Sequence, residues 1–232
     1  MNQPPDKGWL ERTAALLGED ALRRLGGAKA LVVGVGGVGS WCAEALARTG
    51  IGSITVMDDD TVAPSNLNRQ CPALVSTLGQ PKVEAMKARL EAISADIEII
   101  ADSRRYRADS DFRGLALFDV VIDAIDSVDC KAALILNAFE AGVPVISSMG
   151  AAFRLDPTRV KITRFDKVEG DGLAKALRTR FRRLERYPGK FECVWSDEPK
   201  VQCAGEDRGS VMQVTATFGM CLASAAVRAV LK

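Results

Sequence analysis

The chain has 232 residues, 47% of them hydrophobic, so it is long enough to bury a sizeable core within one domain. Its formal net charge is +1, so no global charge points to nucleic acid, and any basic surface must be local. The absence of histidine excludes Ser-His-Asp and Cys-His catalysis and histidine-bound metals. The polar N-terminus and the six scattered cysteines without a C-x-x-C pair predict a cytoplasmic protein with reduced thiols and no structural zinc.

The first two thirds of the chain predict alternating strands and helices. Apolar runs suit buried strands, and apolar residues at helical spacing suit amphipathic helices. The expected elements are a helix over 10–25, a strand over 30–34, a helix over 40–48, a strand over 53–58, a polar loop over 59–80, a helix over 82–93, strands over 97–102 and 118–126, a helix over 131–141 and a strand over 143–149. This order predicts an α/β fold with a doubly wound, Rossmann-like, mostly parallel sheet and helices on both faces.

The last third adds strands over 159–166 and 191–199, a basic helix over 172–187 and a long apolar segment over 211–231. That last segment reaches the ~20 residues that span a bilayer. Because Gln213 and Arg228 interrupt it, we expect it in the core or at a dimer interface and expect no membrane association.

A glycine loop, GVGGVGS over 34–40, joins the first predicted strand to the following helix. Gly34 suits a tight turn, Gly36 and Gly37 let a phosphate approach the backbone amides, and Gly39 allows close helix–strand packing. Asp58 ends the second strand, where a carboxylate usually binds ribose hydroxyls. These features fit NAD and ATP equally, and a tight turn without a ligand is the alternative.

Polar residues downstream favour ATP handled for its reactive phosphates. Arg69 suits bidentate phosphate contacts, and Lys82 could neutralise the α-phosphate as pyrophosphate departs. Asp126 ends the fourth strand, where a carboxylate is well placed for Mg²⁺, while Asp123 has a structural role inside the strand end. Asp60 either places a metal or substrate or is a solvated loop acid. Further candidate contacts are Ser65, Asn66, Gln70 and Ser127.

These motifs resemble the ThiF/MoeB/HesA superfamily of adenylating enzymes, which are related to ubiquitin-activating enzymes. The matching stretches are GVGGVGS, Asp58-x-Asp60, SNLNRQ, GQPK over 79–82 and DAIDS over 123–127. Within the superfamily, RTAALLGEDALRRL, CVWSDEP and VTATFGMCLAS are similar to the tRNA threonylcarbamoyladenosine dehydratases, and the resemblance covers nearly the whole chain. The sulfur-carrier activators of the superfamily usually carry a zinc site with paired cysteines, which this sequence lacks.

The resemblance implies ATP- and Mg²⁺-dependent cyclising dehydration of N6-threonylcarbamoyladenosine in tRNA, by adenylation of its carboxylate and ring closure with loss of AMP. It places Gly37 on the nucleotide, Asp58 on the ribose and Asp126 on the metal. Asn66, Arg69 and Lys82 would meet the phosphates. Arg12 matches an arginine that relatives contribute to the partner's ATP, which implies a homodimer.

The family pattern also implies one adenylation domain over 1–232, with an N-terminal helical arm over 1–27 and a nucleotide-binding core over 28–150. Residues 151–232 form the substrate-side and dimer-interface extension. The chain departs from the pattern at Trp9, where arginine is common, and between Cys203 and Gly209, where the segment is short.

Two further sites stay open at this level. Cys193 lies near the stretch that crosses the active site in ubiquitin-type relatives, so it is either a thioester or sulfur-relay residue with a protein partner or a small buried thiol. The basic helix over 172–187 is either a tRNA contact or a solvated face. Its candidate contacts are Lys175, Arg178, Arg180, Arg182, Arg183 and Arg186, with Arg104, Arg105 and Arg107 as a second candidate cluster.

Three other functions compete with the dehydratase interpretation. An activator of a ubiquitin-like sulfur carrier would adenylate a protein C-terminus. An NAD-dependent oxidoreductase would explain the glycines and Asp58 but leave Arg69, Lys82 and Asp126 without roles. A non-catalytic nucleotide-binding partner would keep the motifs for folding alone.

Overall fold

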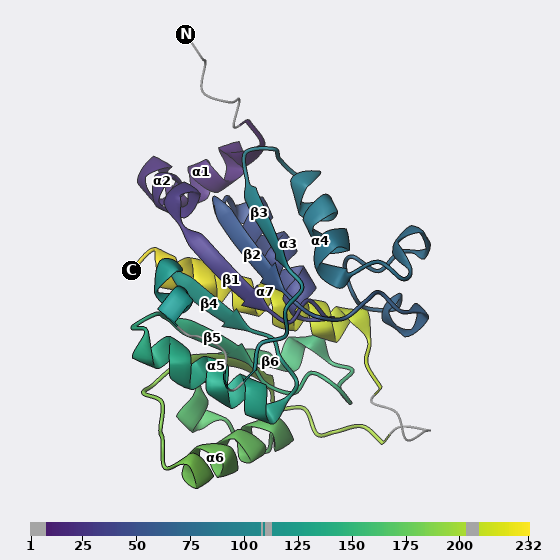
Figure 1. Cartoon of the computed structure of the whole chain (residues 1–232), viewed down its shortest axis with the longest axis vertical. Helices are drawn as coiled ribbons and strands as arrows, with labels where there is room; N and C mark the ends of the chain where they lie inside the picture. Colours follow the sequence, from purple (N-terminus) through teal and green to yellow (C-terminus); the bar gives the residue numbers. More distant parts are fainter. Residues whose placement is uncertain (1–7, 108, 110–112, 203–208) are drawn as a thin grey trace.

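The computed structural model describes residues 8–107, 109, 113–202 and 209–232, so the segment between Cys203 and Gly209 lies outside the described residues. Its centre is a seven-stranded sheet with the order β3-β2-β1-β4-β5-β7-β6 (Figure 1). The strands are β1 (Lys29–Val33), β2 (Ser53–Met57), β3 (Glu98–Asp102), β4 (Val120–Asp123), β5 (Val145–Ser148), β6 (Val160–Arg164) and β7 (Glu192–Ser196). All neighbours pair in parallel except β6 and β7, which confirms the predicted doubly wound sheet.

Helices cover both faces of the sheet. They are α1 (Glu11–Leu17), α2 (Glu19–Gly27), α3 (Gly39–Thr49), α4 (Lys82–Glu91), α5 (Val128–Glu140), α6 (Gly172–Leu184) and α7 (Met212–Val230). One core cluster joins the sheet to α3, α4 and α7, and a second joins it to α5 and α6. Short 3₁₀ turns occupy Gly8–Leu10, Pro64–Asn66, Val75–Thr77, Arg113–Leu117, Pro157–Arg159 and Phe165–Lys167.

The single helix predicted over 10–25 is two helices in the structure, because the chain breaks at Gly18. The φ of Gly18 is +84°, a backbone conformation that favours glycine and ends α1. Leu16 in α1 is 83% exposed, whereas Leu25 near the end of α2 is fully buried. Both helices lie at the top of Figure 1, beyond the start of β1.

Helix α7 is long and apolar enough to cross a membrane by length and composition. In the fold it packs along α3 and across four strands of the sheet, and Val214, Phe218 and Leu222 are fully buried. Gly219 permits this packing, since a Cβ there would lie 2.6 Å from the carbonyl oxygen of Val38. The structure therefore confirms the prediction of a core helix for this segment.

Candidate active site

A cleft of about 410 Å³ opens at the carboxyl ends of β1, β2 and β4, where parallel α/β sheets usually bind ligands. It brings together most residues that the sequence singled out for nucleotide binding. They are Gly34, Gly36, Gly37, Asp58, Asp60, Asn66, Arg69, Gln70, Lys82, Asp126 and Ser127. Gly39 and Ser65 do not line the cleft.

The glycine loop forms one wall, and its backbone tolerates no side chain at two positions. The φ of Gly34 is +91°, and a Cβ there would lie 2.7 Å from the carbonyl oxygen of Ala124, the residue directly after β4. A Cβ on Gly39 would lie 1.8 Å from the carbonyl oxygen of Gly34. Gly39 is thus a packing residue, and its position at the start of α3 turns that helix's partial positive charge toward the cleft.

Asp58 is held in a fixed orientation by backbone amides. Its Oδ2 accepts a 2.6 Å hydrogen bond from the amide of Val35, and its Oδ1 accepts a 2.9 Å bond from the amide of Asp60. A carboxylate has further lone pairs beyond these two bonds. Asp58 therefore joins the end of β2 to the glycine loop and can still accept hydrogen bonds from ribose hydroxyls.

Lys82 is 5% exposed, although it is a lysine at the first residue of a helix. Its Nζ lies 2.6 Å from Oδ2 of Asp60, and its amide donates to the carbonyl of Asp60 at 2.9 Å. The role of Asp60 left open by the sequence is thus to hold the lysine ammonium in the cleft. Bound phosphates would offer this ammonium a second partner.

Arg69 lies directly over the glycine loop. A Cβ on Gly37 would lie 3.1 Å from the arginine's Cγ. Its Nη1 donates to the Ser65 carbonyl and to Oδ1 of Asn68, both at 2.9 Å, so Ser65 positions the guanidinium through its backbone. The arginine is therefore held in place before any phosphate binds.

Asn66 and Gln70 shape the loop that carries Arg69. Oδ1 of Asn66 accepts a 3.1 Å bond from the Ala63 amide, and its carbonyl accepts from the amide of Gln70 at 3.0 Å. The Oε1 atom of Gln70 is buried without a hydrogen-bond partner and belongs to a residue lining the cleft. Asn66 thus acts on the loop, while Gln70 keeps an unused hydrogen-bond acceptor in the wall of the cleft.

A fully buried ion pair lies under the opposite wall. Oδ2 of Asp123 accepts from Nζ of Lys131 at 2.7 Å and from Oγ of Ser147 at 2.6 Å. Oδ1 accepts from the amide of Ile125 at 3.2 Å, which fixes the turn leading to the exposed Asp126. The structural role expected for Asp123 agrees with these contacts.

Four lining residues come from segments that the sequence did not connect to the nucleotide. Arg104, Arg105 and Tyr106 follow β3, and Thr215 lies in the first turn of α7. The basic run follows the carboxyl end of a parallel strand, which is a signal for a place at the cleft, whereas the sequence suggested it as a second candidate cluster for tRNA contact. Hydrogen bonds from Arg104 hold the pKa of Asp102 below its usual value.

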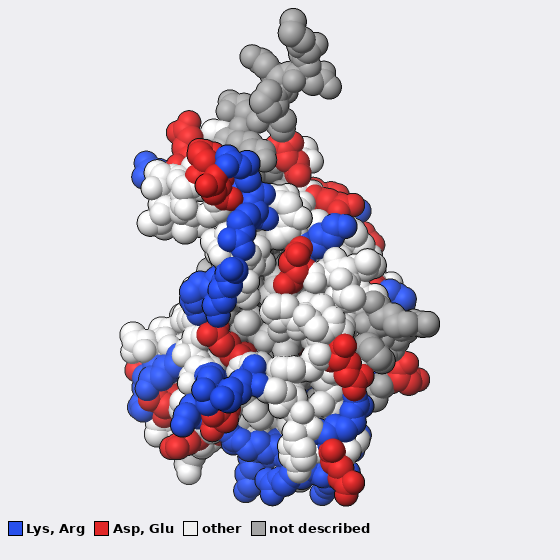
Figure 2. All heavy atoms as spheres, turned by 90° about the vertical axis from the view of Figure 1, so that its left-hand side faces the viewer, with Lys and Arg blue, Asp and Glu red and all other residues white. Residues whose placement is uncertain are grey.

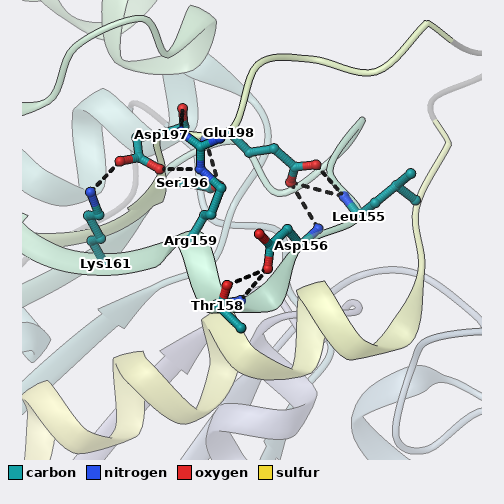
Figure 3. A network of polar contacts seen from close by, with 8 residues as sticks. All are labelled: Leu155, Asp156, Thr158, Arg159, Lys161, Ser196, Asp197 and Glu198. Atoms are coloured by element: carbon teal, nitrogen blue, oxygen red, sulfur yellow. Dashed lines mark hydrogen bonds and ion pairs between the residues drawn. The ribbon is translucent and has the colours of Figure 1, made fainter.

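The loop over 151–156 is joined by hydrogen bonds to the residues after β7 (Figure 3). The carboxylate of Glu198 accepts hydrogen bonds of 3.0 to 3.1 Å from the amides of Leu155 and Asp156. Oγ of Ser196 accepts from the amide of Glu198 at 3.2 Å. Since Ala151 and Ala152 of this loop line the cleft, the SDEP stretch sets the shape of its outer wall.

Other predicted residues lie outside the cleft. Arg12 is exposed on α1, beyond the far end of the sheet, so it does not meet this chain's own nucleotide site. Cys193 is fully buried in β7, and burial raises the pKa of its thiol to about 12. These features agree with the alternative of a small buried thiol.

The basic residues of α6 and of the segment directly after it differ in whether they bind other groups of the chain. Arg178 donates to the carbonyls of Phe165 and Val168, Arg180 pairs with Asp129, and Arg186 pairs with Glu140. Lys175, Arg182 and Arg183 are exposed and form no ion pair within the described part of the chain.

Comparison with known proteins matches this arrangement to one family. Residues 10–232 fit the ThiF family. The chain belongs to the ThiF family. It also belongs with the tRNA threonylcarbamoyladenosine dehydratases: that enzyme from Bacillus subtilis is 42% identical, over 82% of this chain and 75% of the relative. The Escherichia coli enzyme is 36% identical over 95% of this chain and 93% of its own length.

A solved structure supports the same assignment. The E. coli dehydratase TcdA in complex with ATP superposes with a TM-score of 0.90 at 37% identity, covering 99% of this chain and 97% of that one. The fold therefore has an ATP-bound counterpart in a protein that is similar along its whole length.

Replacing Lys82 with Met should lower turnover about 100-fold or more, as removal of one preorganised charge contact to a transition state typically does. The fold should survive, because the Asp60 side chain left behind is 67% exposed and hydrated. Steady-state kinetics and a thermal melt measure both effects. Lys87→Met is the matched control, because Lys87 is a partly exposed lysine of the same helix and does not line the cleft. Equal turnover in both variants would contradict the assignment.

Cys193→Ala should retain most turnover, because a thiol whose pKa is raised to about 12 stays protonated at neutral pH and is a poor nucleophile. In the native protein, iodoacetamide should label Cys130, which lines the cleft and is partly exposed, faster than Cys193. Peptide mass spectrometry reads the labelling. Loss of turnover in Cys193→Ala with intact ATP binding would contradict this expectation and favour a catalytic role for the thiol.

Proposed function

We propose that this chain is an ATP-dependent dehydratase that cyclises N6-threonylcarbamoyladenosine in tRNA. The observation that carries the proposal is the convergence of the glycine loop, Arg69 and Lys82 on one cleft, in a chain similar along its length to the dehydratases. ATP is the cosubstrate because the cleft offers cations for phosphates.

The proposed reaction has two steps. A carboxylate oxygen of the threonylcarbamoyl group attacks the α-phosphorus of ATP, the bond to the bridging oxygen breaks, and pyrophosphate leaves. An atom of the same modification then attacks the acyl carbon, AMP departs with one carboxylate oxygen, and the nucleoside is one water lighter. The nucleophile is part of the substrate, so no protein nucleophile is needed.

The chain's own residues supply position and charge. Asp58 would accept hydrogen bonds from the ribose hydroxyls. The amides of the glycine loop would donate hydrogen bonds to phosphate oxygens, and Arg69 would bind the outer phosphates. Lys82 would neutralise the α-phosphate while negative charge moves to pyrophosphate. Such preorganised electrostatics and proximity suffice for acyl transfer without histidine.

Mg²⁺ fits the donor set at the end of β4. Asp126 presents a carboxylate to the cleft, the hard oxygen ligand that Mg²⁺ prefers together with substrate phosphates. Asp58, Asp59 and Asp60 also place oxygens within 4.8 Å of one another. We assign the ion to Asp126, because this carboxylate lines the cleft just beyond the end of β4. When bound, the ion would neutralise phosphate charge.

A homodimer and a cytoplasmic setting complete the proposal. Arg12 lies too far along the sheet to serve its own cleft, which supports the role in a partner's site that the family resemblance implies. A tRNA substrate supports a cytoplasmic setting. The exposed cations Lys175, Arg182 and Arg183 would meet tRNA phosphates.

Nucleoside mass spectrometry tests the proposal. The protein is incubated with Mg-ATP and tRNA carrying uncyclised threonylcarbamoyladenosine, and the digest should contain a species one water lighter. Its formation should require ATP and be lost in Arg69→Ala. Absence of that species with protein shown to bind ATP would contradict the proposal and favour adenylation of a protein tail.

A further inference from the structure

A second hollow of about 510 Å³ lies at the edge of the sheet opposite the ATP cleft. The C-terminal end of α6, the segment 187–191 and the residues after β6 form its walls. Because β7 runs parallel to β5 and β6 antiparallel to it, the start of β7 and the end of β6 meet at this amino edge. The hollow is therefore separate from the nucleotide site.

The floor of this groove is aromatic. The rings of Phe165 and Phe191 stack with centroids 4.8 Å apart and planes 16° from parallel, and Phe181 meets Phe165 edge-on at 6.2 Å. Tyr187 lines the groove and is 68% exposed. A tyrosine so exposed beside a stacked aromatic floor offers a flat ligand a face to stack on.

The rim of the groove is positive. The guanidinium of Arg178 lies 5.0 Å from the centroid of Phe165, and Arg182 and Lys190 are exposed lining residues. Asp166, the acidic residue among those lining the groove, forms an ion pair with Arg164. An occupant of this groove must therefore combine a planar apolar face with negative charge.

Helix α6 connects the groove to the ATP cleft. At its start, Asp171 accepts hydrogen bonds from the amides of Ala174 and Gly150, and Gly150 follows β5 at the carboxyl edge. At ~1.5 Å per residue, the helix Gly172–Leu184 spans about 20 Å from that edge to the groove. Lysine and arginine side chains gather at the lower end of Figure 2, at the height of α6 in Figure 1.

We propose that the groove binds an unpaired base of the tRNA, with the adjoining phosphates lying along α6. The inference rests on the proposed function for the identity of the RNA. An exposed base has a flat aromatic face and is linked to phosphates on both sides, so it satisfies the aromatic floor and the cationic rim together. Stacking on aromatic or arginine planes is how proteins commonly hold unpaired bases.

Tyr187→Ala should weaken tRNA binding about tenfold, the usual scale for loss of one base-stacking side chain. Tyr187→Phe keeps the ring and should bind tRNA like the wild type. Filter binding of the modified tRNA without ATP measures both affinities. In turnover, Tyr187→Ala should raise KM for tRNA by a similar factor and leave kcat and KM for ATP unchanged.

Equal tRNA affinity in wild type, Tyr187→Ala and Tyr187→Phe would overturn the inference and leave the groove to a protein partner. Loss of affinity in both variants would also overturn it, since the ring would not be the binding element. The binding assay needs no catalysis, so its result stands apart from the proposed function. A wild type that binds tRNA but never cyclises it would refute the function, and the affinity of Tyr187→Ala would still decide the groove assignment.

Discussion

The buried ion pair between Asp123 and Lys131 is the interaction on which the site depends. It joins the ends of β4 and β5 to α5 where neither charge meets water, and Asp123 also binds the amide of Ile125. The turn held in this way leads to Asp126. It also places the Ala124 carbonyl so close to Gly34 that a Cβ on Gly34 would lie 2.7 Å from its oxygen. Removing one partner of such a pair leaves an uncompensated charge, at a typical cost of ~3–5 kcal/mol. The ion pair thus positions the turn after β4, which forms one wall of the cleft and contacts the glycine loop that forms the other.

The same logic of prearranged charge runs through the nucleotide site. Lys82 forms an ion pair with Asp60, and Arg69 donates hydrogen bonds to a backbone and a side-chain oxygen. Asp58 accepts hydrogen bonds from two backbone amides. Each group is oriented before a ligand arrives, so little reorganisation accompanies the movement of charge from carboxylate to pyrophosphate. A chain without histidine can catalyse this reaction because its chemistry consists of positioning a substrate nucleophile and neutralising phosphate.

Sequence patterns predicted the parallel sheet and most of the cleft because those features are local. Strand ends of a doubly wound sheet converge by topology, so Asp58 and Asp126 could be placed on the same edge from the chain order alone. The break at Gly18 escaped prediction because an apolar spacing continued across it. Thr215 and the loop over 151–156 escaped because tertiary packing of α7 and the Glu198 hydrogen bonds bring them to the cleft. Nor does any sequence pattern indicate that Arg178 donates hydrogen bonds to two backbone carbonyls.

The central claim, that the substrate carboxylate attacks the α-phosphate, is tested most directly by following an oxygen atom. A tRNA whose threonylcarbamoyl carboxylate carries a heavy oxygen isotope is cyclised with Mg-ATP. The masses of the released AMP, pyrophosphate and any inorganic phosphate are then measured by mass spectrometry. The account predicts that AMP gains one labelled oxygen while pyrophosphate gains none. Label in inorganic phosphate would show attack at the γ-phosphate instead and would contradict the adenylation mechanism.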